Sequence, residues 1–186
     1  MSDKKIIIGF VGEIASGKDT AVMYLVKKYH ASQYKFSGIL RDILNRLYLE
    51  LSRENLQKIS QVLRENFSQD ILSKVIASDV QADNNAIVIV NGIRRASDIV
   101  YLRELPNFHI IHITADMRTR YERLVQRGEN SDDKTKTFEQ FQKDHKAEAE
   151  LEIATIAKRA SHMIDNNGNF EDLHTQLDAL VEKVQS

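Results

Sequence analysis

Residues 6–20, Ile-Ile-Ile-Gly-Phe-Val-Gly-Glu-Ile-Ala-Ser-Gly-Lys-Asp-Thr, join an unbroken apolar run to a loop that contains glycine. The run from Ile6 to Val11 is rich in β-branched residues, which is typical of a strand buried on both faces of a parallel sheet. A helical pattern begins at Thr20, directly after the loop. The stretch therefore predicts a strand, a glycine loop and a helix in succession, the first unit of an α/β fold.

The loop has the spacing of a phosphate-binding P-loop. In this pattern, backbone N–H groups surround phosphate oxygens, and a lysine, here Lys18, reaches the β and γ phosphates of a nucleotide. The following helix adds the positive end of its dipole. An ordinary turn with an incidental lysine is the alternative, but the strand and helix that the motif requires are both present. We therefore expect a nucleotide site at Gly12, Ala15, Ser16, Gly17, Lys18, Asp19 and Thr20.

The rest of the chain repeats the alternation of strands and helices. Further strands are predicted at 86–90 and 109–113, with shorter ones at 34–36 and 162–164. Apolar residues spaced three and four apart predict helices at roughly 38–51, 53–82, 96–104, 117–127, 138–158 and 169–184. This order of elements indicates an α/β sandwich around one core.

The composition fits one compact domain. With 186 residues and 42% hydrophobic content, the chain is long enough for a core of its own. A formal net charge of −1 gives no global field that would recruit extended nucleic acid or an anionic membrane. The lack of cysteine excludes disulfide scaffolds, thiolate metal sites and cysteine nucleophiles. No apolar run is long enough to span a bilayer and no signal peptide is evident, so we expect a cytoplasmic protein.

The Gly-Lys-x-Thr ending of the loop resembles adenylate kinase and its relatives. Beyond the loop, the chain is similar over nearly its whole length to the nucleoside monophosphate kinase group, which includes dephospho-coenzyme A kinase. The resemblance implies a three-layer α/β/α P-loop kinase fold with a central five-stranded parallel sheet. It also implies that residues 1–186 form a single domain, with a helical acceptor-binding insert at about 38–83 and a short lid at about 128–145. ATP and Mg²⁺ are the implied cofactors.

The segment Phe36-Ser37-Gly38-Ile39-Leu40-Arg41 is similar to the family segment that holds the acceptor nucleotide. Arg94 follows a predicted strand, at the edge where α/β sheets bind ligands, and is expected to meet the acceptor phosphate. The expected acceptor-binding residues are Ser37, Arg41, Arg64 and Arg94. A serine before a helix, such as Ser37, is more often an N-cap, and Arg41 and Arg64 are also compatible with solvated positions on helices.

Asn91 stands at the family's aspartate position, where a carboxylate organises water around magnesium. An amide keeps an oxygen acceptor but loses the charge, which weakens the expected metal site. Asp19 could hold such a water, although a carboxylate in a first helical turn also favours the helix N-terminus. The expected water-mediated metal set is therefore Asp19, Thr20 and Asn91.

Arg123 and Arg127 lie four residues apart on a predicted helix, so two guanidinium groups can converge on one polyphosphate. They match the family's lid arginines, although pairing with Glu122 and Glu129 on a solvated face is the alternative. Lys18, Arg94, Arg123 and Arg127 form the expected catalytic set. Asn167, in the turn after the last predicted strand, resembles a family segment beside the adenine ring, although a plain turn explains these residues equally well.

These residues predict an ATP-dependent phosphotransferase whose acceptor is a small phosphate-bearing molecule, first of all a nucleoside or deoxynucleoside monophosphate. A phosphate acceptor needs its charge neutralised by arginines rather than a strong base. Two alternatives stay open: activity like that of dephospho-coenzyme A kinase, and a nucleotide-dependent binding or switch protein with weak catalysis. The base of the acceptor, the choice of ATP or GTP and the oligomeric state are not encoded in any pattern that we recognise.

Overall fold

The computed structural model describes residues 5–127, 133–145 and 148–185. In these residues, five strands form one all-parallel sheet in the order β2-β3-β1-β4-β5. The strands are β1 (Ile6–Val11), β2 (Ser32–Lys35), β3 (Ile87–Asn91), β4 (Phe108–Thr114) and β5 (His162–Asp165). β1 lies in the middle, between β3 and β4. The glycine loop that follows β1 is therefore at the centre of the carboxyl edge of the sheet.

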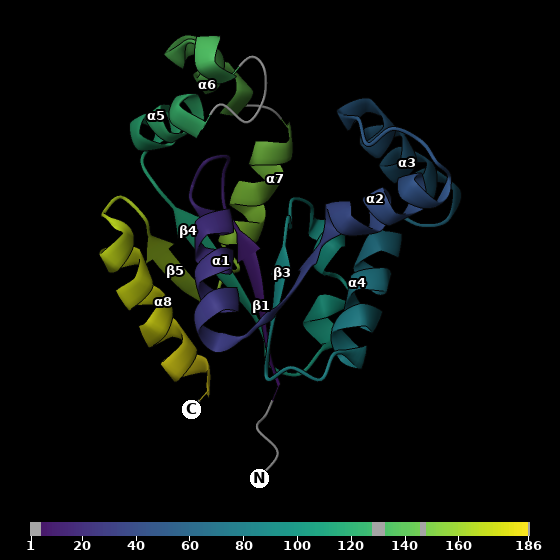
Figure 1. The fold of residues 1–186 in the computed structure, drawn as a ribbon, viewed down its shortest axis with the longest axis horizontal. Helices are drawn as coiled ribbons and strands as arrows, with labels where there is room; N and C mark the ends of the chain where they lie inside the picture. Colours follow the sequence, from purple (N-terminus) through teal and green to yellow (C-terminus); the bar gives the residue numbers. More distant parts are fainter. Residues whose placement is uncertain (1–4, 128–132, 146–147, 186) are drawn as a thin grey trace.

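Helices cover both faces of the sheet, which completes the three-layer α/β fold expected from the sequence (Figure 1). The α-helices are α1 (Lys18–Tyr29), α2 (Phe36–Arg46), α3 (Arg53–Asn66), α4 (Ile71–Ala82), α5 (Met117–Arg127), α6 (Phe138–His145), α7 (Glu148–Ala157) and α8 (Phe170–Gln185). Three short 3₁₀ turns are η1 (Ala96–Ile99), η2 (Leu102–Glu104) and η3 (Asp133–Thr135).

Side chains of β1 divide between two apolar clusters. Ile6, Ile8 and Phe10 pack with α1 and α8 on one face, whereas Ile7 and Val11 pack with α4 and α7 on the other. Because both faces are covered, neither set of alternating positions can be polar. This arrangement explains the unbroken apolar run in the sequence. The same reasoning correctly located the other strands to within about two residues.

The structure differs from the predicted helices at 38–51, 53–82 and 96–104, which are shorter, divided or replaced by 3₁₀ turns. The helix expected at 38–51 ends at Arg46, because Tyr48 adopts the left-handed region with φ 55°. The N–H groups of Tyr48 and Leu49 bond to the carbonyls of Asn45 and Leu44 at 3.1 and 2.9 Å, which is a Schellman stop. The helix expected at 53–82 is divided into α3 and α4, and the one expected at 96–104 is two 3₁₀ turns.

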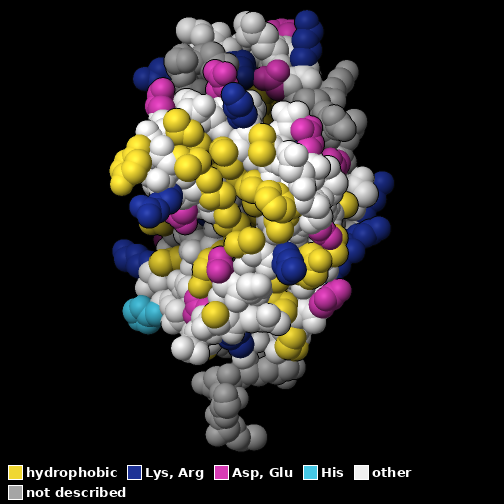
Figure 2. Space-filling view, turned by 90° about the vertical axis from the view of Figure 1, so that its right-hand side faces the viewer, with side chains coloured by type: hydrophobic (Ala, Val, Ile, Leu, Met, Phe, Trp, Pro, Cys, Tyr) yellow, Lys and Arg dark blue, Asp and Glu magenta, His cyan; other side chains and the backbone are white. Residues whose placement is uncertain are grey.

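We call α2 and α3, residues 36–66, the helical arm, because α3 projects away from the sheet at the upper right of Figure 1. α4, which also falls in the insert predicted at 38–83, packs on the sheet through Leu72, Ile76 and Val80. The arm and the turns that flank it expose large apolar side chains: Leu47, Tyr48, Leu49, Leu51, Val62 and Phe67. Hydrophobic side chains gather on the side of the molecule formed by α3 and α4 (Figure 2).

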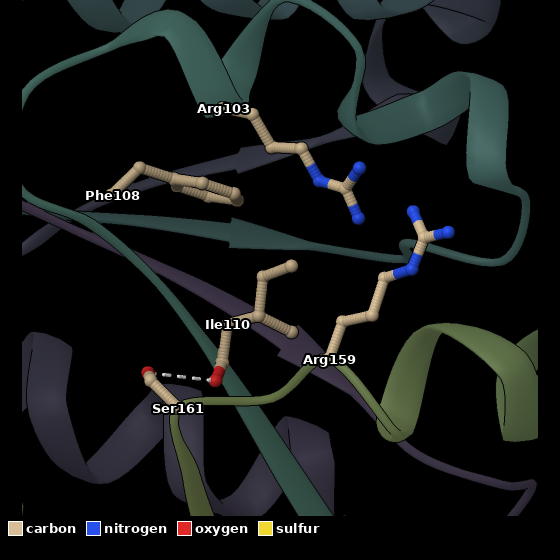
Figure 3. Close-up of a pocket in the computed structure, with 5 residues that line it drawn as sticks. All are labelled: Arg103, Phe108, Ile110, Arg159 and Ser161. Atoms are coloured by element: carbon tan, nitrogen blue, oxygen red, sulfur yellow. Dashed lines mark hydrogen bonds between the residues drawn. The ribbon is translucent and has the colours of Figure 1, made fainter.

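A pocket lined by Arg103, Phe108, Ile110, Arg159 and Ser161 opens at the amino ends of β4 and β5 (Figure 3). It is therefore at the edge of the sheet opposite to the glycine loop. Within the described ranges, no helix is both long and apolar enough to cross a membrane.

Candidate functional site

The glycine loop leaves no room for side chains at two of its glycines. A Cβ atom on Gly12 would lie 2.2 Å from the carbonyl oxygen of Ile113, and one on Gly17 would lie 2.0 Å from Nδ2 of Asn166. Gly17 also has φ 99° and is the N-cap of α1. Ala15 adopts φ 59°, a costly conformation for a residue with a side chain. The loop is thus a tight backbone turn that ends at the N-terminus of a twelve-residue helix.

Lys18 crosses the loop. Its Nζ donates hydrogen bonds to the carbonyl oxygens of Gly12 and Glu13 at 2.7 and 2.8 Å, and lies 3.5 Å from Oγ of the buried Ser16. The ammonium group is therefore held within the turn, next to the first backbone N–H groups of α1. A cation combined with a helix N-terminus is suited to binding the phosphates of a nucleotide.

Two buried residues that sequence reasoning missed hold the loop from outside. Asn166 Nδ2 donates to the carbonyl oxygen of Ser16 at 2.8 Å, and Arg120 donates to the carbonyls of Ala115 at 3.0 Å and Ile14 at 3.4 Å. Asn166 is 6% exposed and Arg120 is 3% exposed. Nothing in the local sequence distinguishes these residues, because their partners in the loop are more than a hundred positions away.

Glu13 and His112 meet beneath the loop. Oε2 of Glu13 lies 3.7 Å from Nε2 of His112, and both side chains are mostly buried. Burial by itself raises the pKa of the Glu13 carboxyl, but His112, the loop backbone and the charge of Arg120 together lower that pKa to about 2. Glu13 is therefore a carboxylate at neutral pH, and it fixes one negative charge under a loop that is otherwise suited to anions.

Of the residues expected to hold magnesium, Asp19 in the first turn of α1 and Asn91 at the end of β3 contact each other. Oδ1 of Asp19 accepts a hydrogen bond from Nδ2 of Asn91 at 2.9 Å and another from Lys35 at 3.4 Å. Oδ1 of Asn91 accepts from the N–H of Gly92 at 2.8 Å. Asn91 thus directs its amide donor, not its oxygen, toward Asp19. With one carboxylate, Asp19, these residues fit a cation that is held mainly by phosphates and water. No cluster of three or more acidic or histidine ligands occurs in the described segments.

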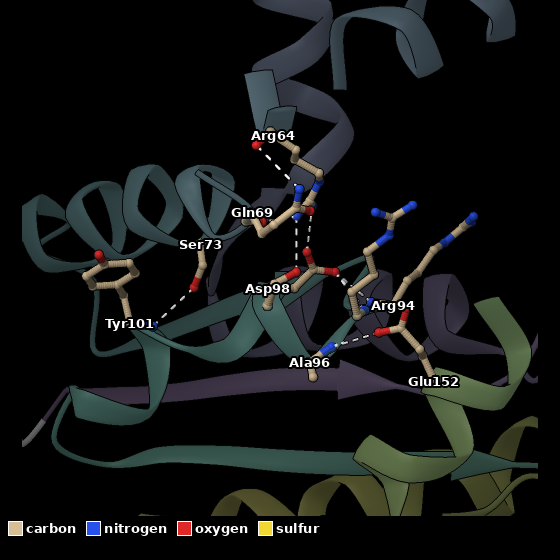
Figure 4. A network of polar contacts seen from close by, with 10 residues as sticks. Arg64, Gln69, Ser73, Arg94, Ala96, Asp98, Tyr101 and Glu152 are labelled. Atoms are coloured by element: carbon tan, nitrogen blue, oxygen red, sulfur yellow. Dashed lines mark hydrogen bonds and ion pairs between the residues drawn. The ribbon is translucent and has the colours of Figure 1, made fainter. Parts of the chain in front are cut away.

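Arg94 lies three residues after the end of β3, on an exposed turn whose backbone N–H groups bond to buried or partly buried carboxylates (Figure 4). Oδ2 of Asp98 accepts hydrogen bonds from the backbone N–H groups of Arg94 and Arg95, both at 2.9 Å. Oε2 of Glu152, from α7, accepts one from the N–H of Ala96 at 3.2 Å. The backbone of the turn is therefore held in place while the side chain of Arg94 is exposed. Ser37 and Arg41 are also exposed, at the start of α2.

Arg64 requires a correction. It was expected to contact an acceptor, but its guanidinium is buried and pairs with Asp98 at 2.8 Å, with side chains 7% and 4% exposed. It also donates to the carbonyl of Gln69 and to Oγ of Ser97. The physical reason is that the carboxylate of Asp98 is buried and needs a cation. Arg64 therefore connects the helical arm to the turn that carries Arg94.

The structure describes only part of the expected lid at about 128–145. Residues 128–132, including Gly128 and Glu129, lie outside the described residues. α6 packs on α5 through the ring of Tyr121, which contacts Phe138 and Phe141, and the hydroxyl of Tyr121 donates to the carbonyl of Lys136 at 3.0 Å. Nη1 of Arg123 is buried without a hydrogen-bond partner in the described parts of the chain, and Arg127 is exposed. That these two arginines converge on a polyphosphate stays a prediction.

Asn167, expected beside the adenine ring, joins the end of β5 to the start of α5. Its Oδ1 accepts from the N–H of Asp116 at 2.8 Å, and its Nδ2 donates to Asp165 at 2.7 Å. The residue is exposed. Its side-chain bonds fix the turn, so any contact with a nucleotide base would come from the backbone or from the remaining amide surface.

Comparison with known proteins places this site in a P-loop context. The AAA domain family AAA_18 matches residues 8–151. A UPF0200 protein of Hyperthermus butylicus is 25% identical over 180 residues, covering 97% of this chain and 95% of its own. A UPF0200 protein of Thermococcus kodakarensis is 27% identical over 186 residues, covering 97% and 99%.

Solved structures share the fold at low identity. TT1252 from Thermus thermophilus has a TM-score of 0.62 at 16% identity, covering 97% of this chain and 98% of its own. A shikimate kinase from Acinetobacter baumannii, in complex with shikimate, has a TM-score of 0.56 at 14% identity, covering 98% and 94%. These likenesses show a P-loop kinase-like fold.

Proposed function

We propose that this chain, which belongs to the AAA domain family AAA_18, is an ATP-dependent phosphotransferase that acts on a small phosphate-bearing acceptor. A nucleoside or deoxynucleoside monophosphate is the first candidate. The observation that carries the proposal is the geometry of one sheet edge. Lys18 lies in a tight loop after the central strand, and Arg94 lies on a fixed turn after the neighbouring strand. A donor phosphate and an acceptor phosphate can therefore be bound side by side.

In this proposal, protein groups act by position and charge. The loop N–H groups and Lys18 bind the donor phosphates, Arg94 and Arg41 bind the acceptor phosphate, and Arg123 and Arg127 neutralise the transferring group. Phosphoryl transfer needs little covalent help, because alignment and charge stabilisation lower most of the barrier. Mg²⁺, when bound, would neutralise phosphate oxygens, with Asp19 and Thr20 holding its water. A lid at about 128–145 would exclude bulk water.

The amide of Asn91 supports a second candidate function, a nucleotide-dependent switch protein. This amide bonds to Asp19, so this pair contributes one carboxylate to the site instead of two. A site with less negative charge binds magnesium more weakly, which suits a nucleotide-dependent switch protein with weak catalysis. Asn91→Asp distinguishes the two: a large gain in transfer indicates a weakened kinase site, and no change indicates that the amide is a working part of the present one.

A coupled assay with a panel of acceptors tests the proposal. The panel contains nucleoside and deoxynucleoside monophosphates, dephospho-coenzyme A and shikimate, the last because similar solved structures are shikimate kinases. We expect turnover of at least one phosphate-bearing acceptor, and Lys18→Ala should lower it by roughly a thousandfold. Lys27→Ala, an exposed lysine on the same helix, is the matched control. Intact ATP binding with no turnover of any acceptor would contradict the kinase and favour the switch.

Arg94 and Arg95 provide a second, internal comparison. Both are exposed neighbours on one turn, and Asp98 holds both N–H groups. We expect Arg94→Ala to raise KM for the acceptor roughly tenfold or more, since a charge-assisted hydrogen bond is lost. Arg95→Ala should change it little. Equal effects of the two variants would remove Arg94 from the acceptor site.

A further inference from the structure

The pocket at the amino ends of β4 and β5 has a volume of about 320 Å³. Phe108 is the first residue of β4, and Ser161 directly precedes β5. Because all strands run parallel, these ends lie at the edge of the sheet away from the P-loop, which follows the carboxyl end of β1. The pocket is therefore separate from the proposed nucleotide site.

Two arginines reach into this pocket from different segments. Arg103 comes from η2 and Arg159 from the turn after α7, and their side chains point toward the same opening (Figure 3). In the part of the chain that the structure describes, neither guanidinium has a hydrogen bond or an ion pair. Burial and the positive charge of Arg159 both lower the pKa of Arg103. Two like charges that face one opening without a counter-charge favour an anion between them.

The remaining lining residues limit the kind of ligand that the pocket can bind. Phe108 and Ile110 supply an aromatic and an aliphatic wall. The hydroxyl of Ser161 donates to the carbonyl of Ile110 at 3.2 Å, so its proton is already in use. Donors to a ligand can therefore come only from the arginines among these five side chains. A guanidinium offers paired N–H groups that match the oxygens of a phosphate or a carboxylate.

We propose that this pocket binds a small oxyanion ligand, with its phosphate or carboxylate between Arg103 and Arg159 and a ring-sized apolar body against Phe108 and Ile110. Its volume lies at the lower end of the range for small-molecule sites, so a single ring with one anionic group fits better than a whole dinucleotide. The site does not depend on the proposed transferase activity, because no lining residue belongs to the P-loop edge.

Titration of the full chain with phenyl phosphate, followed by NMR, tests the proposal. We expect saturable shifts of the arginine Nε–H signals and of the backbone amides of Phe108 and Ser161. Arg103→Gln and Arg159→Gln should each weaken binding at these signals by roughly tenfold or more. Arg46→Gln, an exposed arginine on α2, is the matched control. Neither pocket variant should lower Tm, because each removes a like-charge contact.

Two further probes separate the parts of the ligand. Inorganic phosphate should bind more weakly than phenyl phosphate, because it leaves Phe108 without a partner; equal affinity would overturn the apolar half of the proposal. Benzoate compares carboxylate with phosphate on the same ring, and the tighter of the two identifies the oxyanion. Shifts confined to the Gly17 amide, or an unchanged response in both arginine variants, would place the phenyl phosphate elsewhere and overturn the site.

Discussion

The phosphate loop and the helical arm are held in different ways. Buried side chains from distant segments, Asn166 and Arg120, bond the carbonyls of the loop, and its glycines leave no space for a Cβ atom. The arm packs on the core through α2 and through Leu56, Ile59 and Leu63 of α3, and its buried polar connection is the pair of Arg64 with Asp98. Its outer surface and the adjoining turns expose large apolar side chains, among them Tyr48 and Phe67.

The two regions therefore differ in which interactions hold them in place. A loop that the fold fixes on several sides is ready for a phosphate before any ligand arrives. The arm is held mainly by apolar packing and by one buried ion pair, so its stability depends strongly on that pair. Arg64 lies where the arm meets the turn of Arg94, because its partner Asp98 also holds that turn.

The largest effect is expected from Asp98→Asn. It leaves the buried guanidinium of Arg64 without a counter-charge, and breaking a buried pair in this way costs about 3 to 5 kcal/mol of unfolding free energy. Urea unfolding measures it. Asp42→Asn, an exposed carboxylate on α2, is the control and should change little. A small effect of Asp98→Asn would mean that the arm does not depend on this pair.

The next largest expected effect is that of Glu13→Gln on how the free energy of unfolding depends on pH. The Glu13 carboxyl has a pKa of about 2 in the folded protein, below the ordinary 4.5. A lowered pKa contributes stability that is present above about pH 4.5 and is lost as the pH falls toward about 2. We expect the wild type to lose about 2 to 3 kcal/mol more than Glu13→Gln across this window. Parallel losses in the two proteins would show that His112 does not hold the carboxylate in its charged form.

Most of the fold could be predicted from the sequence because its signals are local. Strands covered on both faces require continuous apolar runs, as in β1 and β3. The P-loop requires small residues at fixed spacing, because backbone approaches backbone there. The end of α2 was missed, since a tyrosine at Tyr48 takes the left-handed position that glycine usually marks.

The positions of Lys18 and Arg94 at the carboxyl edge of the sheet could be predicted because each follows a strand, whereas their roles stay predictions. Arg64 was assigned to the acceptor because an arginine looks the same in sequence whether it is solvated or buried. Its partner is 34 positions away, and the partner of Asn166 is 150 positions away. Contacts at such separations depend on how the layers pack, and a single sequence carries no signal for them.

A moderate effect is expected from Asn166→Ala. The carbonyl of Ser16 would lose its buried donor, which costs about 1 to 2 kcal/mol of unfolding free energy. The loop should also hold phosphate less tightly, so the Kd for ATP should rise. Isothermal titration and urea unfolding measure the two quantities, with Asn84→Ala, an exposed asparagine, as the control. An unchanged Kd for ATP would show that the loop keeps its shape without this bond.

The smallest effect on the free energy of unfolding is expected from Phe67→Ser, at the end of the arm. Phe67 is 72% exposed at the end of α3, so Phe67→Ser removes little buried area, and the free energy of unfolding should stay within about 0.5 kcal/mol of the wild type. Phe10→Ala, at a fully buried phenylalanine, is the contrasting variant and should cost about 3 to 5 kcal/mol. If Phe67→Ser instead cost more than about 1 kcal/mol, Phe67 would be part of the core and the arm would be as firmly held as the loop. A neutral result means that folding does not require this apolar side chain.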